Sequence, residues 1–451
     1  YRPRDSNNMS AQSQFELLGQ RRFLPFFITQ FLGAFNDNAF KNALVILIAF
    51  HVANQTVESA RFLQNLSAVV FILPFFLFSS TAGQIGDSVE KSWLIRQIKL
   101  FEIIIMAVAV IGFMSHSVTL LMVVLFFMGT QSAFFGPVKY GYMPQHLDET
   151  ELVGGNGLVE MGTFLAILTG MLTGGHLLNI NVSGEWISML VLAIAVVGYM
   201  SARQIPHTPV AYPGLQINWN IFSQTWNTLR LARQNKTVFH CVVGISWFWF
   251  IGSTYMVQLP LYTKKILGGD PTVFNMLIGL FCIGIGLGSV LCEKLSHHRI
   301  ETALVPLGAI GLTLFGIDLY FATPLLLSHE LIDYRTWLAN SAHWRSVIDI
   351  IGIGVFGGFY IVPLFAVVQQ RSERSILSRV IAGNNILNAI FMVLAALFAM
   401  LVLVVIGLQE DELFLLIAVM NVLVIGSILL LEPEFMDSFR RWLRINKRSW
   451  S

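Results

Sequence analysis

The chain has 451 residues, of which 55% are hydrophobic and only 12% are charged, and its mean hydropathy is +0.67. A soluble chain carries about twice that charged fraction, so most of this surface must face lipid. The net charge of +2 comes without a clustered basic face, which excludes an argument for nucleic acid as a partner. Three cysteines without C-x-x-C spacing predict neither a disulfide framework nor a metal site, and we expect no cofactor.

Apolar windows long enough to cross a bilayer recur along the whole chain. The predicted helices cover 23–50, 61–83, 93–113, 118–136, 152–178, 185–202, 238–263, 273–292, 302–321, 346–369, 380–405 and 412–431. They fall into two groups of six, separated by a polar segment in which 221–231 is amphipathic and suited to a membrane surface. We therefore predict an all-α polytopic membrane protein with twelve transmembrane helices in two pseudo-symmetric bundles. The predicted divisions are a cytoplasmic segment 1–22, bundles 23–202 and 238–431, a cytoplasmic linker 203–237 and a tail 432–451.

The distribution of basic residues predicts the orientation. Of the 28 lysines and arginines, 22 fall in segments on one side of the predicted helices. Because basic loops are retained in the cytoplasm, both termini are expected there.

A short internal repeat favours two halves related by duplication. Leu152–Glu160 is similar to Val380–Asn388, which follows 228 residues later, and each segment begins the fifth helix of its half. Chance similarity between apolar segments is the alternative. A parallel repeat of this kind is typical of transporters built from two six-helix halves.

The first predicted helix contains polar and charged residues within an otherwise apolar span. Asp37 and Lys41 are four residues apart and so lie on one helix face, where they could pair and keep each other charged. Asn36 and Asn38 flank the aspartate. Ionisable groups at this depth are costly, so the pair is expected to face a central cavity; a purely structural intrahelical ion pair is the alternative.

The loop after the second predicted helix runs from Gly83 to Lys91, with the sequence GQIGDSVEK. It resembles the major facilitator loop pattern G-x-x-x-D-R-x-G-R-K, without the first arginine and the second glycine. Glycine allows helix ends to approach closely, and Asp87 can face a helix N-terminus or a cation, stabilising one of two alternating states. A solvated loop acid is the alternative.

The remaining polar groups are distributed unevenly between the halves. The first half adds Glu160 and the pair Lys99 and Glu102, whereas the second half has Asn384, Asn385 and Asn388 beside the aromatic run 247–250. A cavity that is polar on one side and apolar on the other suits an amphipathic ligand, although membrane aromatics commonly face lipid or pack against other helices.

The sequence contains no pattern for catalysis or for the use of ATP. No histidine is followed five residues later by an aspartate, so the H-x-x-x-x-D pattern of glycerolipid acyltransferases is absent, and there is no Walker loop. We predict a transporter rather than an enzyme, driven by the substrate gradient or by an ion gradient.

Three segments carry a resemblance to one family. They are QFLGAFNDNA from Gln30, GQIGD from Gly83, and GPVKYG from Gly136 together with LVGGNGLVE from Leu152. In these segments the chain resembles the lysophospholipid transporters of the major facilitator superfamily, strongly over 23–180 and mainly in topology thereafter.

The resemblance implies the major facilitator fold and a monomer. It also implies movement of lysophospholipid, chiefly lysophosphatidylethanolamine, from the outer to the inner leaflet of a Gram-negative inner membrane. The lipid would then be reacylated by an acyltransferase or acyl-ACP synthetase on the cytoplasmic side. The segment 434–451 resembles the part that joins such a transporter to a fused acyltransferase, so a free-standing carrier and part of a fusion both remain open.

The polar pattern and the resemblance together predict two groups of site residues. The predicted substrate-binding residues are Gln30, Asn36, Asp37, Asn38, Lys41, Glu160, Asn384 and Asn388. The predicted conformational gate consists of Gly83, Asp87, Lys91, Lys139, Tyr140 and Asn156.

Two other functions compete with lysophospholipid transport. In a proton-coupled exporter or symporter of small amphipathic solutes, Asp37 or Glu160 would carry the proton. In a membrane anchor for an acyltransferase there would be no transport, but an anchor has no use for costly charge inside the membrane.

Overall fold

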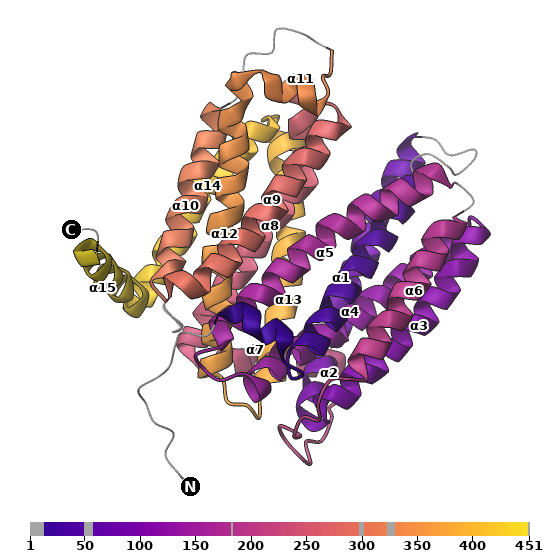
Figure 1. Cartoon of the computed structure of the whole chain (residues 1–451), viewed down its shortest axis with the longest axis vertical. Helices are drawn as coiled ribbons and strands as arrows, with labels where there is room; N and C mark the ends of the chain where they lie inside the picture. Colours follow the sequence, from indigo (N-terminus) through magenta and orange to yellow (C-terminus); the bar gives the residue numbers. More distant parts are fainter. Residues whose placement is uncertain (1–12, 49–56, 182–183, 297–301, 323–329, 450–451) are drawn as a thin grey trace.

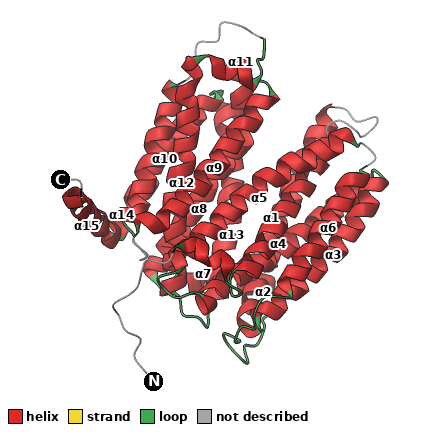
Figure 2. Ribbon diagram, viewed as in Figure 1, coloured by secondary structure: helices red, strands yellow, loops and turns green. Residues whose placement is uncertain are grey.

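The computed structural model describes residues 13–48, 57–181, 184–296, 302–322 and 330–449. Within these ranges the chain consists of helices and loops, with one isolated bridge between Gly269 and Ile332 (Figure 2). The last two residues of the predicted first helix, 49–50, and residues 1–12 of the predicted N-terminal segment lie outside the described residues.

Six long helices form each half of the molecule. The first half contains the 3-10 helix η1 (Gln14–Gly19), then α1 (Leu24–Ile46), α2 (Val57–Ser88), α3 (Lys91–Met114), α4 (Val118–His146), α5 (Leu152–Ile180) and α6 (Glu185–Ala202). After the linker helix α7 (Ile221–Ala232), the second half contains α8 (Lys236–Lys265), α9 (Pro271–Leu295), α10 (Leu304–Phe321), α12 (Trp344–Arg371), α13 (Leu377–Met400) and α14 (Glu410–Leu431). Shorter elements are α11 (Tyr334–Ala339), η3 (Ser341–His343), the π-helical extension η4 (Leu401–Ile406) of α13, and the C-terminal helix α15 (Pro433–Ser449).

Eleven helices in the described part of the chain are long and apolar enough to span a membrane. The predicted twelfth is α1, whose 23 residues extend for about 35 Å at 1.5 Å per residue. Asn36, Asp37, Asn38 and Lys41 lower its hydropathy without shortening it. The all-α, two-bundle prediction is therefore confirmed.

Two helix ends differ clearly from the prediction. The second helix was expected to end at 83, with a loop from Gly83 to Lys91, but α2 continues to Ser88, so Gly83 and Asp87 lie in its last turns. The fourth helix was expected to end at 136, before Pro137, but α4 continues through Pro137 and Pro144 to His146. A proline inside a helix removes one backbone hydrogen bond, and this cost is tolerated in membrane proteins where neighbouring helices pack around the site. Both prolines are buried. The continuation carries Lys139 and Tyr140 on a helix rather than in a loop.

The two halves converge at one end of the molecule and separate towards the other (Figure 1). The helix α7 lies at the convergent end, and α11 lies at the far end of the second half. One apolar core passes through both halves, with Val159 of α5, Ile285 of α9 and Phe365 of α12 among its buried members. A second core, which includes Leu47 and Phe113, is confined to the first half. The halves therefore share a core around the convergent end.

Close helix packing in the first half depends on glycine. A Cβ at Gly174 of α5 would collide with the backbone of Ala39 in α1, so these two helices approach nearly to backbone contact. This contact holds α1, with its polar residues, firmly against α5.

We expect Gly174→Leu to destabilise the protein by about 1–3 kcal/mol, because the added side chain must force α1 away from α5. Thermal unfolding of the purified chain in detergent measures this change. Gly426→Leu is the matched control, since a Cβ there meets nothing within 4 Å. Equal melting temperatures for the two variants would contradict the close packing of α1 on α5.

Candidate functional site

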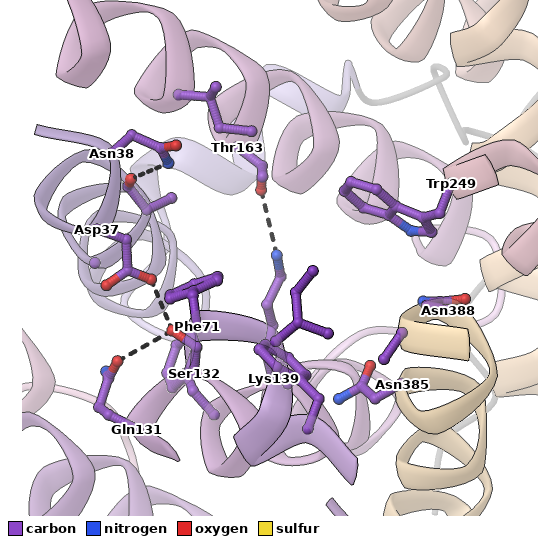
Figure 3. Close-up of a pocket in the computed structure, with 18 of the residues that line it drawn as sticks. Asp37, Asn38, Phe71, Gln131, Ser132, Lys139, Thr163, Trp249, Asn385 and Asn388 are labelled. Atoms are coloured by element: carbon purple, nitrogen blue, oxygen red, sulfur yellow. Dashed lines mark hydrogen bonds between the residues drawn. The ribbon is translucent and has the colours of Figure 1, made fainter. Parts of the chain in front are cut away.

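A cavity of about 370 Å³ lies between the two halves. Figure 3 shows it enclosed by side chains from both, with Asp37 and Trp249 on opposite sides. Its lining comes from α1, α2, α4 and α5 of the first half and from α8 and α13 of the second: Gln30, Gly33, Ala34, Asp37, Asn38, Lys41, Phe71, Ile72, Phe75, Gln131, Ser132, Phe135, Gly136, Lys139, Tyr140, Thr163, Ile167, Trp249, Met256, Asn385, Asn388, Ala389 and Met392.

The charged groups of the cavity come from the first half. The carboxylate of Asp37 accepts a hydrogen bond of 2.7 Å from the hydroxyl of Ser132 (Figure 3). The ammonium of Lys41 lies 4.3 Å from the centre of the Phe71 ring. Lys139 donates to the hydroxyl of Thr163 over 3.2 Å.

The expected ion pair between Asp37 and Lys41 is not formed: the two groups are beyond the 4.0 Å limit for a salt bridge, although they remain within electrostatic range. The reason is that each side chain has another neighbour. Ser132 of α4 binds the carboxylate, and the ring of Phe71 in α2 attracts the ammonium through its negative face. Both charged groups therefore line the cavity separately.

A deeply buried charge pair of the first half, Lys99 with Glu102, lies behind the cavity. Their ammonium and carboxylate are 2.6 Å apart, and the two side chains are only 1% and 3% exposed. Glu102 also accepts hydrogen bonds of 3.0 Å from Asn36 and 3.1 Å from Gln131. The amide oxygen of Gln131 lies 3.3 Å from the same Ser132 hydroxyl and can share its single hydrogen with Asp37, so polar contacts link Asp37 to the buried pair.

Three of the predicted substrate-binding residues lie outside the cavity lining. Asn36 points to Glu102 instead. Glu160 accepts a 2.6 Å hydrogen bond from the hydroxyl of Tyr140 and lies within electrostatic range of Lys139. Asn384 is buried one position away from Asn385, which does line the cavity. The predicted residues that do line it are Gln30, Asp37, Asn38, Lys41 and Asn388.

The second half contributes a lining without charged side chains in the part that the structure describes. Trp249 and Met256 of α8 face it, together with Asn385 and Asn388 of α13 (Figure 3). Asn388 accepts a 2.8 Å hydrogen bond from Ser246. The cavity is thus charged on one side and largely apolar on the other.

At the convergent end, Asp87 in the last turn of α2 reaches from the first half to the second. Its carboxylate accepts hydrogen bonds from the backbone N–H groups of Ser378 (2.9 Å) and Arg379 (3.3 Å), at the start of α13, and from the Arg379 guanidinium (3.0 Å). The Asp87 side chain is fully buried. A helix N-terminus and a cation both favour a carboxylate, and here one acid uses both. A Cβ at Gly83 would collide with Ala382 of α13, so the α2 end needs glycine to reach that helix.

Glu90, the N-cap of α3, binds within its own half and to the linker. Glu90 caps α3 by accepting from the N–H groups of Ser92 and Trp93, and it also accepts a 2.8 Å hydrogen bond from the N–H of Thr208. Burial alone would raise the pKa of the Glu90 carboxyl, but the hydrogen bonds from Ser92, Thr208 and Trp93 outweigh burial and lower it. The end of α2 therefore makes the contact with α13, and Glu90 after it fixes the start of the linker.

Two further polar contacts join the halves at this end. Gln369 of α12 exchanges hydrogen bonds with Asn156 of α5 (2.6 and 3.3 Å) and donates to the backbone carbonyl of Tyr140 over 3.2 Å. Gln14 of η1 donates from its backbone N–H to Glu293 over 3.0 Å and from its amide to the carbonyl of Val290 over 2.8 Å. Gln14, Glu293 and Gln369 were not predicted, because nothing local in the sequence marks a contact between residues more than 200 positions apart.

The predicted gate residues occupy two places. Gly83, Asp87 and Asn156 lie at the contacts between the halves, and Lys91 is buried beside Gly141 of α4. Lys139 and Tyr140 line the cavity instead, although the Tyr140 ring also stacks on Phe365 of the second half at a centroid distance of 4.2 Å. Tyr140 thus lies at the floor of the cavity, where the halves meet.

Comparison with known proteins identifies the fold family. The family model described as Major Facilitator Superfamily matches residues 26–339. The chain belongs to this superfamily. It is therefore a multi-pass membrane transporter, as predicted, rather than an enzyme.

Two curated relatives have the same name. The chain is 28% identical over 387 residues to the lysophospholipid transporter LplT of Escherichia fergusonii, covering 84% of this chain and 88% of that protein. It is 29% identical over 374 residues to the LplT of an Escherichia coli strain, covering 80% and 82%. This similarity agrees with the family resemblance in the first-half motifs.

Solved structures with the same fold are more distant in sequence. The human organic anion transporter MFSD10 superposes with a TM-score of 0.73 at 13% identity, over 90% of this chain and 99% of that chain. The transporter FucP in its outward conformation superposes with a TM-score of 0.68 at 12% identity, over 91% and 98%. At this identity the structures establish the shared fold.

We expect Glu102→Gln to destabilise the protein by about 3–5 kcal/mol, because it leaves the Lys99 ammonium buried without its counter-charge. The double variant Lys99→Met with Glu102→Gln should be less destabilised than the single one, since no unpaired charge remains. Thermal unfolding in detergent compares the two. A single variant as stable as the wild type would contradict the buried ion pair.

Proposed function

We propose that the chain is a lysophospholipid transporter that moves a single-chain phospholipid between membrane leaflets. The observation that carries this proposal is the amphipathic cavity between the halves, with charged groups of both signs on one side and apolar groups on the other. The two relatives named as lysophospholipid transporters support the same substrate class.

The headgroup of a zwitterionic lysolipid has an ammonium and a phosphate. Asp37 accepts one hydrogen bond, from Ser132. A carboxylate can accept several, so Asp37 can also accept from the lipid ammonium. Lys41 and Lys139 are available for the phosphate as flexible point charges. The separation of Asp37 from Lys41 favours this arrangement, since neither charge is neutralised by the other.

The acyl chain would occupy the apolar side of the cavity. The apolar lining includes Phe71, Ile72 and Phe75 of α2 as well as Ala389 and Met392 of α13. These helices also pack together at the convergent end, where Gly83 meets Ala382. An acyl chain lying along the apolar lining would therefore point towards the lateral seam between α2 and α13.

Alternating access would transfer the lipid. With both termini in the cytoplasm, the convergent end faces the cytoplasm and the cavity belongs to an outward-facing state. Opening towards the cytoplasm requires the contacts of Asp87, Gln14 and Gln369 with the opposite half to break. We infer that the lipid is delivered from the outer to the inner leaflet of a bacterial inner membrane, for reacylation by a separate or fused acyltransferase, and that the transporter acts as a monomer.

Transfer of labelled lysophosphatidylethanolamine between leaflets of proteoliposomes tests the substrate. The wild-type chain should accelerate transfer, and unlabelled lysolipid should compete where diacyl lipid does not. The assay is run once without and once with an imposed proton gradient. Absence of transfer in both arms would overturn lysophospholipid transport.

Proton coupling remains the second candidate, because Asp37 lacks the direct ion pair with Lys41 that would have made it a poor proton carrier. An acid that faces a cavity without a bonded cation can exchange a proton with it. Transfer that stops when the proton gradient is collapsed would favour a proton-coupled carrier. Transfer that is insensitive to an uncoupler would exclude it.

We expect Asp37→Asn and Lys139→Met each to weaken lysolipid transfer by about tenfold or more, since a charge-assisted hydrogen bond contributes about 1.5–3 kcal/mol. Lys264→Met is the matched control, because Lys264 is exposed at the end of α8, away from the cavity. The same measurement on Lys41→Met tests the second phosphate ligand. Folded variants that retain full transfer would eliminate the headgroup model while leaving the substrate proposal to the wild-type assay.

We expect Asp87→Asn to reduce the population closed at the convergent end by about tenfold or more, because a neutral amide cannot replace the charged acceptor at the start of α13. Spin labels at Asp148 and Arg374, which are exposed in the loops before α5 and α13, measure the separation of the halves. Asp270→Asn is the control, because Asp270 caps α9 at the other end. A distance distribution unchanged from wild type would refute a gating role for Asp87.

A further inference from the structure

The linker helix α7 covers the seam between the two halves. The hydroxyl of Thr225 donates to that of Ser80 in α2 over 3.3 Å, and Thr228 and Ala232 lie against Gly383 of α13. Gln224, Thr228 and Ala232 form the buried face of the helix. Since α2 belongs to the first half and α13 to the second, α7 bridges both.

The level of these contacts places α7 beside the membrane helices rather than beyond their ends. Ser80 lies about 12 Å before the end of α2, and Gly383 about 9 Å after the start of α13, at 1.5 Å per residue. Amphipathic helices at a bilayer surface lie about 5–10 Å deep, at the boundary of headgroups and acyl chains. These contacts fit a helix whose outer face lies at the depth of phospholipid headgroups.

The composition of that outer face fits this depth. Trp219, just before α7, and Phe222 and Trp226 within it are 70%, 87% and 65% exposed. In a protein surrounded by water, aromatic side chains of this size are normally buried. Tryptophan is enriched where a bilayer meets water, because its ring is apolar and its N–H is polar. The exposed aromatic side chains thus indicate contact with lipid.

Two arginines complete the face at its C-terminal end. Trp226, Leu229, Arg230 and Arg233 follow helical spacing and line a hollow of about 300 Å³. In the described part of the chain neither guanidinium has a carboxylate within 4.0 Å, and Arg233 lies 5.2 Å from the ring of Phe239. Two guanidinium groups beside an apolar wall match a phosphate with an attached acyl chain, because arginine binds phosphate through two parallel hydrogen bonds.

We propose that Arg230 and Arg233, with Trp226 and Leu229, bind the phosphate headgroup of an anionic diacyl phospholipid on the outer face of α7, whose other face covers the seam between α2 and α13. Two positive charges without a neighbouring acid favour a headgroup of net negative charge, such as phosphatidylglycerol, over a zwitterionic one. This site is separate from the central cavity and does not depend on which substrate the cavity takes. A lipid bound there would link the seam between the halves to the composition of the surrounding leaflet.

Native mass spectrometry of the full chain in detergent, with phosphatidylglycerol or lysophosphatidylethanolamine added, tests the proposal. We expect retained phosphatidylglycerol to fall about tenfold in the double variant R230Q/R233Q, which loses two charged donors. The control R440Q/R444Q removes the same charge from α15, where Arg440 already has Asp437 as a neighbour at 3.6 Å. It should bind phosphatidylglycerol nearly as well as the wild type.

The variant R230K/R233K separates loss of the site from loss of the fold. It keeps both charges and should recover most of the binding, which a misfolded protein would not. Equal retention of phosphatidylglycerol by the wild type and R230Q/R233Q would overturn the proposal. So would a response confined to lysophosphatidylethanolamine, because the site would then hold the transported lipid rather than an anionic phospholipid of the leaflet.

Discussion

The arrangement of this transporter depends on how a single buried carboxylate is satisfied. Asp87 has no access to water and belongs to the first half, yet its partners are the first turn of α13 and the Arg379 side chain in the second half. An uncompensated buried charge is too costly to persist, so the halves must meet at this end for as long as Asp87 stays buried. The cavity can then widen only away from that contact.

The charged side of the cavity packs against the buried ion pair of Lys99 and Glu102. Asp37 is held by Ser132, Ser132 bonds Gln131, and Gln131 bonds the carboxylate that neutralises Lys99. Such a network orients the Asp37 carboxylate without occupying all of its acceptor positions. The apolar half of the lining needs no comparable support, because Trp249 and Met256 belong to a helix packed within the core of the second half.

Sequence patterns predicted the helices well, because the length of an apolar segment is dictated by the thickness of the bilayer. They also identified Asp37 as facing a cavity, since a charge inside a span is seldom exposed to lipid. They did not predict which neighbour each polar group would choose. Asp37 and Lys41 share a helix face but contact partners on α4 and α2. On α13, Asn385 rather than Asn384 lines the cavity, because neighbouring residues of a helix point in directions about 100° apart. Gln14 and Gln369 could not be found at all, because their partners are distant in the chain.

Several of the contacts that join the halves pair a side chain of one half with a backbone group of the other. Asp87 binds N–H groups of Ser378 and Arg379, Gln369 binds the carbonyl of Tyr140, and Gln14 binds the carbonyl of Val290. Backbone groups are supplied by almost any residue. Evolutionary change at Val290 should therefore leave its contact intact, whereas Ser378 is confined by the close approach of Gly86 and Gly141. Selection on the closed state would act on the polar side chains of both halves, leaving positions that contribute only a backbone group free to diverge.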